Sequence, residues 1–458
     1  MSRSNERAPL LVAASTHSSH SDVANRTHNE GGGEQDEYTS RFNPRLAVSS
    51  ILALVVSLSL IGLGVFYIER LPDDANRAAI KILERAPVID GHIDLPLMVR
   101  EVYRNNITKF NMRERMELQV DIPRLRAGKV GGFFWSVYVD CADAGTDFTR
   151  PTNEVRCVFH SVVLQLAQQE LHRDTLEQID VSKLLIEEYS DTFMLTTTVK
   201  EVEQAMRMGR IASFIGVEGG HQIGNSLAVL RQYYALGARY MTLTHSCNNA
   251  FADSAGIFER IPAAHGGLSS LGQELIREMN RLGMLVDLSH TSDETAIQAL
   301  KLSRAPVMWS HSSARAVHNV PRNVPDNILK MIGTGPGQKD GVVMINLFPR
   351  FLGPEGSKVT VLTAADHIEH IGRVAGREHV GIGSDFDGIE VAPEGLEDVS
   401  KYPALFAELL RRGWSRVELE GLASKNLLRV FRGAEDVARE MQKSTKASLV
   451  LYDKRDPL

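Results

Sequence analysis

Hydrophobic residues follow two different patterns along this chain. Between residues 46 and 68 they form one run without a charge, LAVSSILALVVSLSLIGLGVFYI. Further along, short apolar runs typical of buried parallel strands alternate with amphipathic stretches typical of helices. Eight such runs lie at 87–90, 130–137, 211–217, 239–244, 284–288, 306–310, 341–347 and 379–383. The alternation predicts an α/β protein whose main domain is a (β/α)8 TIM barrel.

The segments between these runs carry helix signals. Residues 268–281 are amphipathic, begin at Ser269 or Ser270 as a capping residue, and stop before Gly283. The longest segment, 141–200, contains two helical patterns at 155–173 and 181–192. We expect it to be a helical insertion in one loop of the barrel.

An open, doubly wound sheet is the alternative architecture for such an alternation. It usually carries a GxGxxG sequence after the first strand, and none follows residues 87–90 here. Polar residues also end most of the predicted strands rather than those at one switch point. Both observations favour the closed barrel.

The apolar run at 46–68 is long enough for a membrane helix. Its 23 residues rise about 1.5 Å each, against a hydrocarbon core of about 30 Å. The alternative is a cleaved signal peptide, but the run is long for one and begins far into the chain. Arg41 and Arg45 precede it, which places the N-terminus in the cytoplasm and the catalytic domain in a lumen or outside the cell.

The domain organisation follows from these patterns. Residues 1–45 have few large apolar side chains and are predicted to be a disordered cytoplasmic tail. We expect a transmembrane signal anchor at 46–68, a linker at 69–85, the barrel at 86–435 and a C-terminal tail at 436–458. With a lumenal or extracellular domain, Asn106 in Asn-Ile-Thr is a usable glycosylation acceptor.

Charge and cysteine content exclude some classes of function. The formal net charge of −6 offers no basic field for nucleic acid. The three cysteines, Cys141, Cys157 and Cys247, have no CxxC spacing for a structural zinc site. They leave room for one disulfide and one free thiol.

Metal-ligand residues stand where several predicted strands end. His92 and Asp94 leave the first strand, Glu218 ends the third, His290 follows the fifth and His311 follows the sixth. Each alone could be a hydrogen-bonded residue at a barrel rim. Strand ends meet on one face of a barrel, however, so the five are expected to form a binuclear site bridged by Glu218. Imidazole and carboxylate ligands suit zinc, and two zinc ions would make the enzyme a hydrolase.

Two further polar residues stand at strand ends. Asp385 follows the eighth strand and could move a proton between water and the leaving amine, with Asp387 as the less favoured choice. His245 ends the fourth strand and could donate to a developing oxyanion, or it could only hold a loop in place.

Six stretches of the chain together resemble the membrane dipeptidase family, also called renal dipeptidase, among the amidohydrolase-like barrels. They are VIDGHIDLP, GVEGGH, YMTLTHSCN, VDLSH, SHSSARAVHNVPRNVPD and GIGSDFDG, in family order between residues 86 and 435. The resemblance implies a zinc metalloprotease that cleaves dipeptides, with metal ligands at His92, Asp94, Glu218 (bridging), His290 and His311.

The resemblance also implies roles for other positions. His245 would contact substrate and the tetrahedral intermediate, Arg322 would bind the substrate carboxylate, and Asp385 would be the acidic catalytic residue. A guanidinium suits a carboxylate because it can bind both oxygens. Cys141 and Cys247 match a family disulfide, which would leave Cys157 free, and a homodimer is expected.

Two other functions stay open at this point. The barrel could hydrolyse another small amide, or it could be a non-catalytic receptor on an enzyme scaffold. The complete set of metal and proton-transfer residues argues against the receptor.

Overall fold

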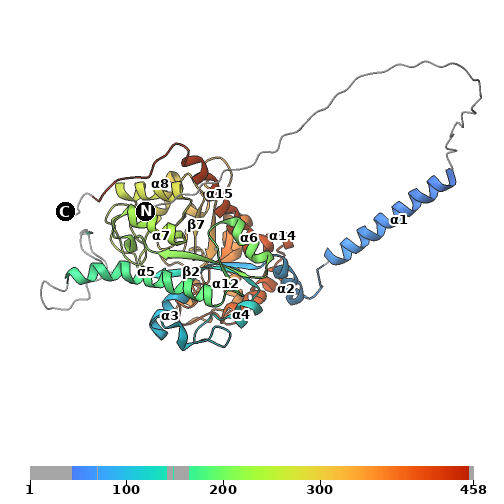
Figure 1. Ribbon diagram of the computed structural model, residues 1–458, viewed down its shortest axis with the longest axis horizontal. Helices are drawn as coiled ribbons and strands as arrows, with labels where there is room; N and C mark the ends of the chain where they lie inside the picture. Colours follow the sequence, from blue (N-terminus) through green and yellow to red (C-terminus); the bar gives the residue numbers. More distant parts are fainter. Residues whose placement is uncertain (1–43, 70, 142–147, 149–163, 453–458) are drawn as a thin grey trace, which may run out of the picture. The chain divides into compact units, whose positions relative to one another are not determined.

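The computed structural model describes residues 44–69, 71–141, 148 and 164–452 (Figure 1). The chain divides into two compact units, residues 1–70 and 71–458. The predicted disordered tail falls almost entirely on residues 1–43, and Cys157 falls on 149–163; both lie outside the described residues.

In the first unit, residues 44–69 form one helix, α1 (Pro44–Glu69). Crossing a bilayer takes about 20 consecutive apolar residues in one helix. Within the described part of the chain, no helix combines that length with sufficient apolarity. The predicted transmembrane helix at 46–68 and the single-pass membrane location are therefore wrong.

The second unit is built on a closed parallel barrel. Its eight strands are β1 (Val88–Ile93), β2 (Val130–Tyr138), β4 (Ile211–Glu218), β5 (Ala238–Thr242), β6 (Leu285–Asp287), β7 (Val307–Trp309), β8 (Gly341–Ile345) and β9 (Val380–Ile382). Each pairs in parallel with its neighbours, and the β1–β9 and β2–β4 pairings close the ring. The predicted TIM barrel is confirmed, and the open sheet is excluded.

One further strand was not predicted. The short β3 (Phe193–Leu195) pairs in parallel with the start of β4, from Phe193 beside Ile211 to Leu195 beside Ser213. Three residues are too few to show the alternation by which a strand is recognised in a sequence.

Helices accompany the strands around this unit (Figure 1). They are α2 (Ala75–Arg85), α3 (Leu95–Tyr103), α4 (Ile122–Ala127), α5 (Leu164–Glu188), α6 (Val199–Arg207), α7 (Leu227–Leu236), α8 (Ser270–Leu282), α9 (Asp293–Leu302), α10 (Asp326–Leu329), α11 (Pro349–Leu352), α12 (Val361–Val374), α13 (Tyr402–Arg411), α14 (Arg416–Glu420) and α15 (Asn426–Met441). Single turns lie at η1 (Ile107–Lys109), η2 (Gly220–Ile223), η3 (Arg377–His379), η4 (Val399–Lys401) and η5 (Gly421–Lys425).

Two helix predictions can be compared directly with the structure. Helix α8 starts after Ser269, whose side chain accepts from the Gly272 amide, and ends at Gly283 with φ 85°, so both signals are confirmed. The insertion instead contains one continuous helix, α5, through the predicted break near residue 175. No glycine or proline interrupts residues 164–188, so nothing in the backbone ends the helix there.

The unit extends beyond residues 86–435 at both ends. Residues 75–85, within the expected linker, form α2, which buries Ala79, Ile82 and Leu83 in the core. At the other end, α15 continues to Met441. A second cluster packs Phe134, Phe214 and other strand residues against Phe431 of α15. This packing fixes the strands and thus the positions of their C-terminal ends.

Candidate metal centre at the barrel mouth

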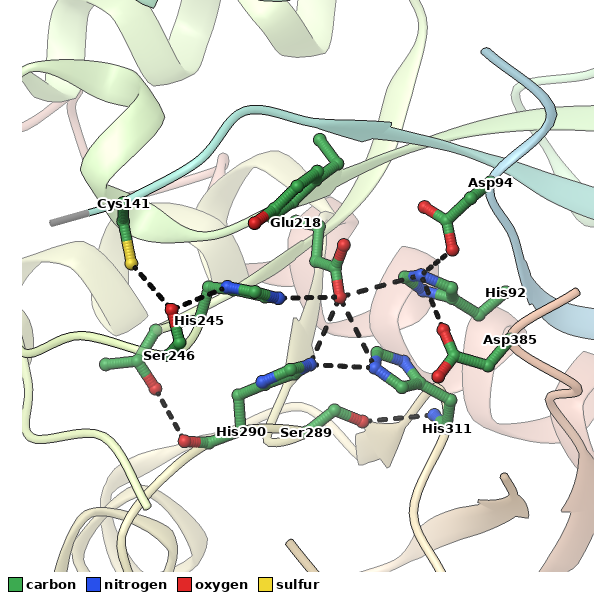
Figure 2. A network of polar contacts seen from close by, with 12 residues as sticks. His92, Asp94, Cys141, Glu218, His245, Ser246, Ser289, His290, His311 and Asp385 are labelled. Atoms are coloured by element: carbon green, nitrogen blue, oxygen red, sulfur yellow. Dashed lines mark hydrogen bonds and ion pairs between the residues drawn. The ribbon is translucent and has the colours of Figure 1, made fainter. Parts of the chain in front are cut away.

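The five predicted ligand residues come together at the C-terminal ends of four strands (Figure 2). His92 lies in β1 with Asp94 just after it, and Glu218 is the last residue of β4. His290 follows β6, and His311 follows β7. All five are buried. Parallel strands bring them to one face, as the sequence pattern predicts.

Glu218 lies at the centre of this group. Its Oε1 atom is 3.1 Å from Nε2 of His290 and 3.3 Å from Nε2 of His311. The same oxygen is 3.6 Å from Nε2 of His92 and 3.7 Å from Nε2 of His245. Figure 2 shows four contacts converging on this one oxygen. The arrangement allows one carboxylate to serve two cations.

The ligand atoms form two overlapping groups. Glu218, His290 and His311 make one, and His92, Asp94 and Glu218 make the other, with the ligand atoms in each group within 4.8 Å of one another. In the second group, Oδ2 of Asp94 is 3.2 Å from Nε2 of His92. These two groups share only Glu218, and a third group, of His92, His311 and Asp385, overlaps both.

Two of the imidazoles contact a hydroxyl group through their Nδ1 atoms. Nδ1 of His92 lies 2.8 Å from the hydroxyl of Tyr240, and Nδ1 of His311 lies 2.8 Å from that of Ser310. Their Nε2 atoms therefore face the centre. Nε2 of His92 and Oδ1 of Asp94 are buried without a hydrogen-bond partner. Buried polar atoms without partners are costly, so this donor set fits a bound cation.

The electrostatics of the site also favour a cation. Burial lowers the pKa of His92, but Asp94 and Glu218 outweigh burial and raise it to about 10. Burial lowers the pKa of His290 and His311 well below the usual range, which leaves a lone pair on each ring for a metal. Burial raises the pKa of Glu218, and the negative charges of Asp94 and Asp385 add to this effect. A bound cation would relieve the repulsion and displace the proton of His92.

Asp385 faces this centre, and Asp387 does not. Oδ1 of Asp385 is 3.8 Å from Nε2 of His92, and its Oδ2 accepts a 2.8 Å hydrogen bond from Asn346. Burial raises the pKa of Asp385 to about 6, against the lowering effect of His92. Asp387 instead accepts from the backbone amide of Gln119 at 2.8 Å. The geometry thus favours Asp385 as the proton carrier.

Two site residues have left-handed backbones. His290 has φ 67° and Asp385 has φ 69°. Residues other than glycine adopt this conformation at a cost, and such positions concentrate at functional sites. The turn after each strand directs these side chains toward the centre.

His245 lies beside the centre, in the loop that follows β5. Its Nδ1 is 3.1 Å from the hydroxyl of Ser246, and its ring is tilted against that of His290 with centroids 4.2 Å apart. Burial lowers its pKa well below the usual range, with a further effect from His221. A neutral His245 has one ring N–H to donate.

Arg322 is a buried cation next to the centre. It is 3% exposed, and its Nη atoms donate to the Ser312 hydroxyl at 3.3 Å and the His311 carbonyl at 3.2 Å. Burial lowers its pKa to about 10, against the raising effect of Asp385, so it stays charged at neutral pH. Within the described residues, no carboxylate lies at ion-pair distance from it, which leaves room for an anionic ligand group.

A cavity of about 370 Å³ opens at this face. Asp94, Glu218, His245, His290 and Asp385 all contribute to its lining. Arg322 instead lines a separate, smaller space, which shares His290 with the main cavity. The candidate ligand residues are therefore open to a small molecule, and Arg322 lies at the neighbouring space on the other side of His290.

The structure links Cys141 to Cys247 by a disulfide, as the family resemblance implies, across 106 positions of sequence. The bond joins the segment after β2 to the loop that carries His245. Asn106, the expected glycosylation acceptor, is exposed at the start of η1, and its glycosylation stays a prediction.

Two residues that support the site were not predicted from sequence. Tyr240 contacts His92 from β5, and Asn346 holds Asp385 from the end of β8. Asn346 could have been found, because it is a polar residue at a predicted strand end. Tyr240 could not, since an aromatic residue inside a strand is indistinguishable from ordinary core.

Comparisons with known proteins agree with this geometry. The family model of membrane dipeptidases, peptidase family M19, matches residues 76–445. An uncharacterized dipeptidase of Schizosaccharomyces pombe is 44% identical over 367 residues, covering 80% of this chain and 85% of the relative. Dipeptidase aclJ of Aspergillus oryzae is 44% identical over 366 residues, covering 79% of this chain and 81% of the relative.

Solved structures give the same result. A metallopeptidase of Rhodobacter sphaeroides, liganded with a phosphinate mimic of L-Ala-D-Ala, superposes with a TM-score of 0.64 at 25% identity, covering 76% of this chain and 99% of that one. Dipeptidase AC, of family M19, superposes with a TM-score of 0.65 at 26% identity, covering 76% and 98%. The chain belongs to the membrane dipeptidase family, peptidase family M19, and is by that membership a metallodipeptidase.

Proposed function

We propose that this enzyme hydrolyses dipeptides at a centre of two zinc ions. His290, His311 and Glu218 would hold one ion, and His92, Asp94 and Glu218 would hold the other. The observation that carries the proposal is the convergence of three imidazole Nε2 atoms and Asp94 around Glu218. Mixed imidazole and carboxylate ligands suit zinc.

When bound, the metal pair would supply an activated water and polarise the amide carbonyl. Asp385 would take a proton from the attacking water and deliver it to the leaving amine. Its position supports this role, because one oxygen faces the centre while Asn346 holds the other at 2.8 Å. A carboxylate fixed in this way can transfer a proton without a change of rotamer.

His245 would stabilise the negative charge that develops on the substrate oxygen. Its Nδ1 contacts the Ser246 hydroxyl at 3.1 Å, and its Nε2 faces Glu218. If Ser246 donates to Nδ1, the ring carries its proton on Nε2. A donor placed in this way before the reaction stabilises the transition state at little reorganisation cost.

Arg322 would bind the C-terminal carboxylate of the dipeptide. It is buried, charged and without a carboxylate partner among the described residues. A guanidinium and a carboxylate form paired hydrogen bonds, and burial strengthens them. This anchor would restrict the enzyme to short substrates, because a longer peptide has no carboxylate at that position.

The test is metal content and dipeptide turnover, measured together in the wild type and in Glu218→Gln. The wild type should bind two zinc ions per chain and cleave dipeptides, and the variant should lose both properties. Dipeptide amides, which lack the carboxylate, should be poor substrates for the wild type. A wild type that retains zinc but cleaves no dipeptide, or that cleaves amides equally well, would contradict the proposal.

A further inference from the structure

Three phenylalanines form one side of the cavity at the barrel mouth. Phe258, Phe348 and Phe351, here called the aromatic wall, all line the cavity that also contains Glu218 and Asp385. The rings of Phe348 and Phe351 are 5.1 Å apart, and that of Phe258 is 5.9 Å from Phe351. The three rings thus make one continuous apolar surface next to the reacting groups.

The wall has a buried and an open part. Phe351 is buried, and its carbonyl accepts a 2.8 Å hydrogen bond from Asn323, which fixes its backbone. Phe258 is 40% exposed although it is a large apolar residue. Since it lines the cavity, its open face is available to a ligand.

The wall lies next to the expected carboxylate anchor. The guanidinium carbon of Arg322 is 5.4 Å from the ring centroid of Phe351. In a dipeptide, the C-terminal side chain and the carboxylate are attached to the same α-carbon. A carboxylate on Arg322 therefore brings the C-terminal side chain against Phe351 and its neighbours.

Arg350 is a charged residue that lines the same cavity and contacts the open part of the wall. Its guanidinium carbon lies 3.6 Å from the ring centroid of Phe258, a cation–π contact. It also lies 3.8 Å from Glu355. Arg350 thus has two partners already and covers one face of Phe258. An apolar side chain can contact the wall without breaking either contact, whereas an acidic one would compete with Glu355.

We propose that the aromatic wall binds the C-terminal side chain of the substrate and makes the enzyme prefer dipeptides that end in a large apolar or aromatic residue. The inference rests on the proposed function, since it takes the substrate carboxylate to bind Arg322. Burial of a large side chain against aromatic rings should raise kcat/KM about 10- to 100-fold over a C-terminal glycine.

The experiment compares kcat/KM of the zinc-loaded full chain for Ala-Gly, Ala-Leu, Ala-Phe and Ala-Asp. The ratio of Ala-Phe to Ala-Gly should be about 10 to 100 in the wild type and fall to within about threefold in Phe258→Ala. The partly exposed position of Phe258 makes the variant compatible with folding, and Phe258→Leu should give an intermediate ratio. Leu362→Ala, a change at a 50% exposed position on α12 outside the cavity lining, should keep the wild-type ratio.

Several results would overturn the assignment. One is an equal rate on Ala-Gly and Ala-Phe in the wild type. Another is a preference for Ala-Asp that disappears in Arg350→Ala, which would make the subsite one for acidic side chains. A third is a kcat/KM ratio of Phe-Ala to Gly-Ala that falls in Phe258→Ala as much as the ratio of Ala-Phe to Ala-Gly does. That result would place the wall at the N-terminal residue of the substrate instead. If the wild type cleaves no dipeptide, the proposed function itself fails, which is a distinct outcome.

Discussion

The hydroxyl oxygen of Tyr240 lies 2.8 Å from Nδ1 of His92. The contact joins two strands, β5 and β1, beneath the candidate metal centre. Space for the tyrosine ring exists because residue 216 is glycine: a Cβ atom there would lie 2.2 Å from Cζ of Tyr240. Tyr240, which is not among the candidate ligands, thus decides which nitrogen of His92 faces the candidate metal centre.

We expect Tyr240→Phe to weaken metal binding about 10- to 100-fold, because loss of a hydrogen bond behind a ligand imidazole has effects of that size. Zinc affinity can be measured by competition with a chromogenic chelator. Tyr189→Phe is the matched control. Its hydroxyl also makes one buried hydrogen bond, from the Met112 amide at 3.1 Å, but away from the site. Equal zinc affinity in wild type and Tyr240→Phe would show that the contact does not orient His92.

Asp385→Asn should retain its zinc and lose about 10²- to 10⁴-fold in kcat, the usual contribution of a general acid–base group. The amide keeps the size of the side chain but cannot carry the proton. Steady-state kinetics together with metal analysis would separate the two effects. Asp387→Asn should lose less than about tenfold, since the side chain of Asp387 is directed to Gln119. A larger loss in Asp387→Asn than in Asp385→Asn would reverse the assignment.

Burial of His367 should make the free energy of unfolding decrease as the pH falls into the mildly acidic range. Burial is the main cause that lowers its pKa to about 4, and its Nδ1 accepts a 3.0 Å hydrogen bond from the Ala314 amide. Between pH 6.5 and 4 the unfolded chain therefore binds a proton that the folded chain does not. This contribution to stability is complete above about pH 6.5 and decreases as the pH falls, by at most about 1.4 kcal/mol per pH unit.

The measurement for His367 is the urea unfolding free energy as a function of pH. His367→Leu should be less stable than the wild type at pH 7.5, because the Ala314 amide loses its acceptor. The difference between the two proteins should then decrease from pH 6.5 to pH 4, since the variant has no proton to gain there. Parallel curves would mean that His367 does not titrate with folding.

Reduction of the Cys141–Cys247 disulfide should lower the unfolding free energy by about 2–4 kcal/mol. The bond closes a long loop, with a sequence separation of 106, and so restricts the unfolded chain. Urea midpoints with and without reductant would measure the effect. The double variant Cys141→Ser/Cys247→Ser should show no response to reductant. A wild type with equal midpoints in both conditions would show that the bond contributes nothing to stability.

Much of the fold could be predicted from local sequence signals. Ser269 and Gly283 mark the two ends of α8 because capping and the left-handed turn depend on residues next to each other in the chain. The insertion was predicted less well. The two separate helical patterns expected there are one continuous helix, α5, in the described residues, because no glycine or proline within residues 164–188 ends the helix. The apolar composition of residues 46–68 suggested a membrane span, but composition alone did not establish one.

The sequence by itself determined the order of the strands and the five ligand-type residues at their ends, because both follow from short periodic patterns and from the rule that parallel strands end on one face. Only the tertiary structure decided that Tyr240 directs His92, that Asp385 rather than Asp387 faces the centre, and that Phe351 lies beside Arg322. These contacts join residues 29 to 293 positions apart. They depend on side-chain packing and on backbone angles such as φ 69° at Asp385, which no local pattern specifies.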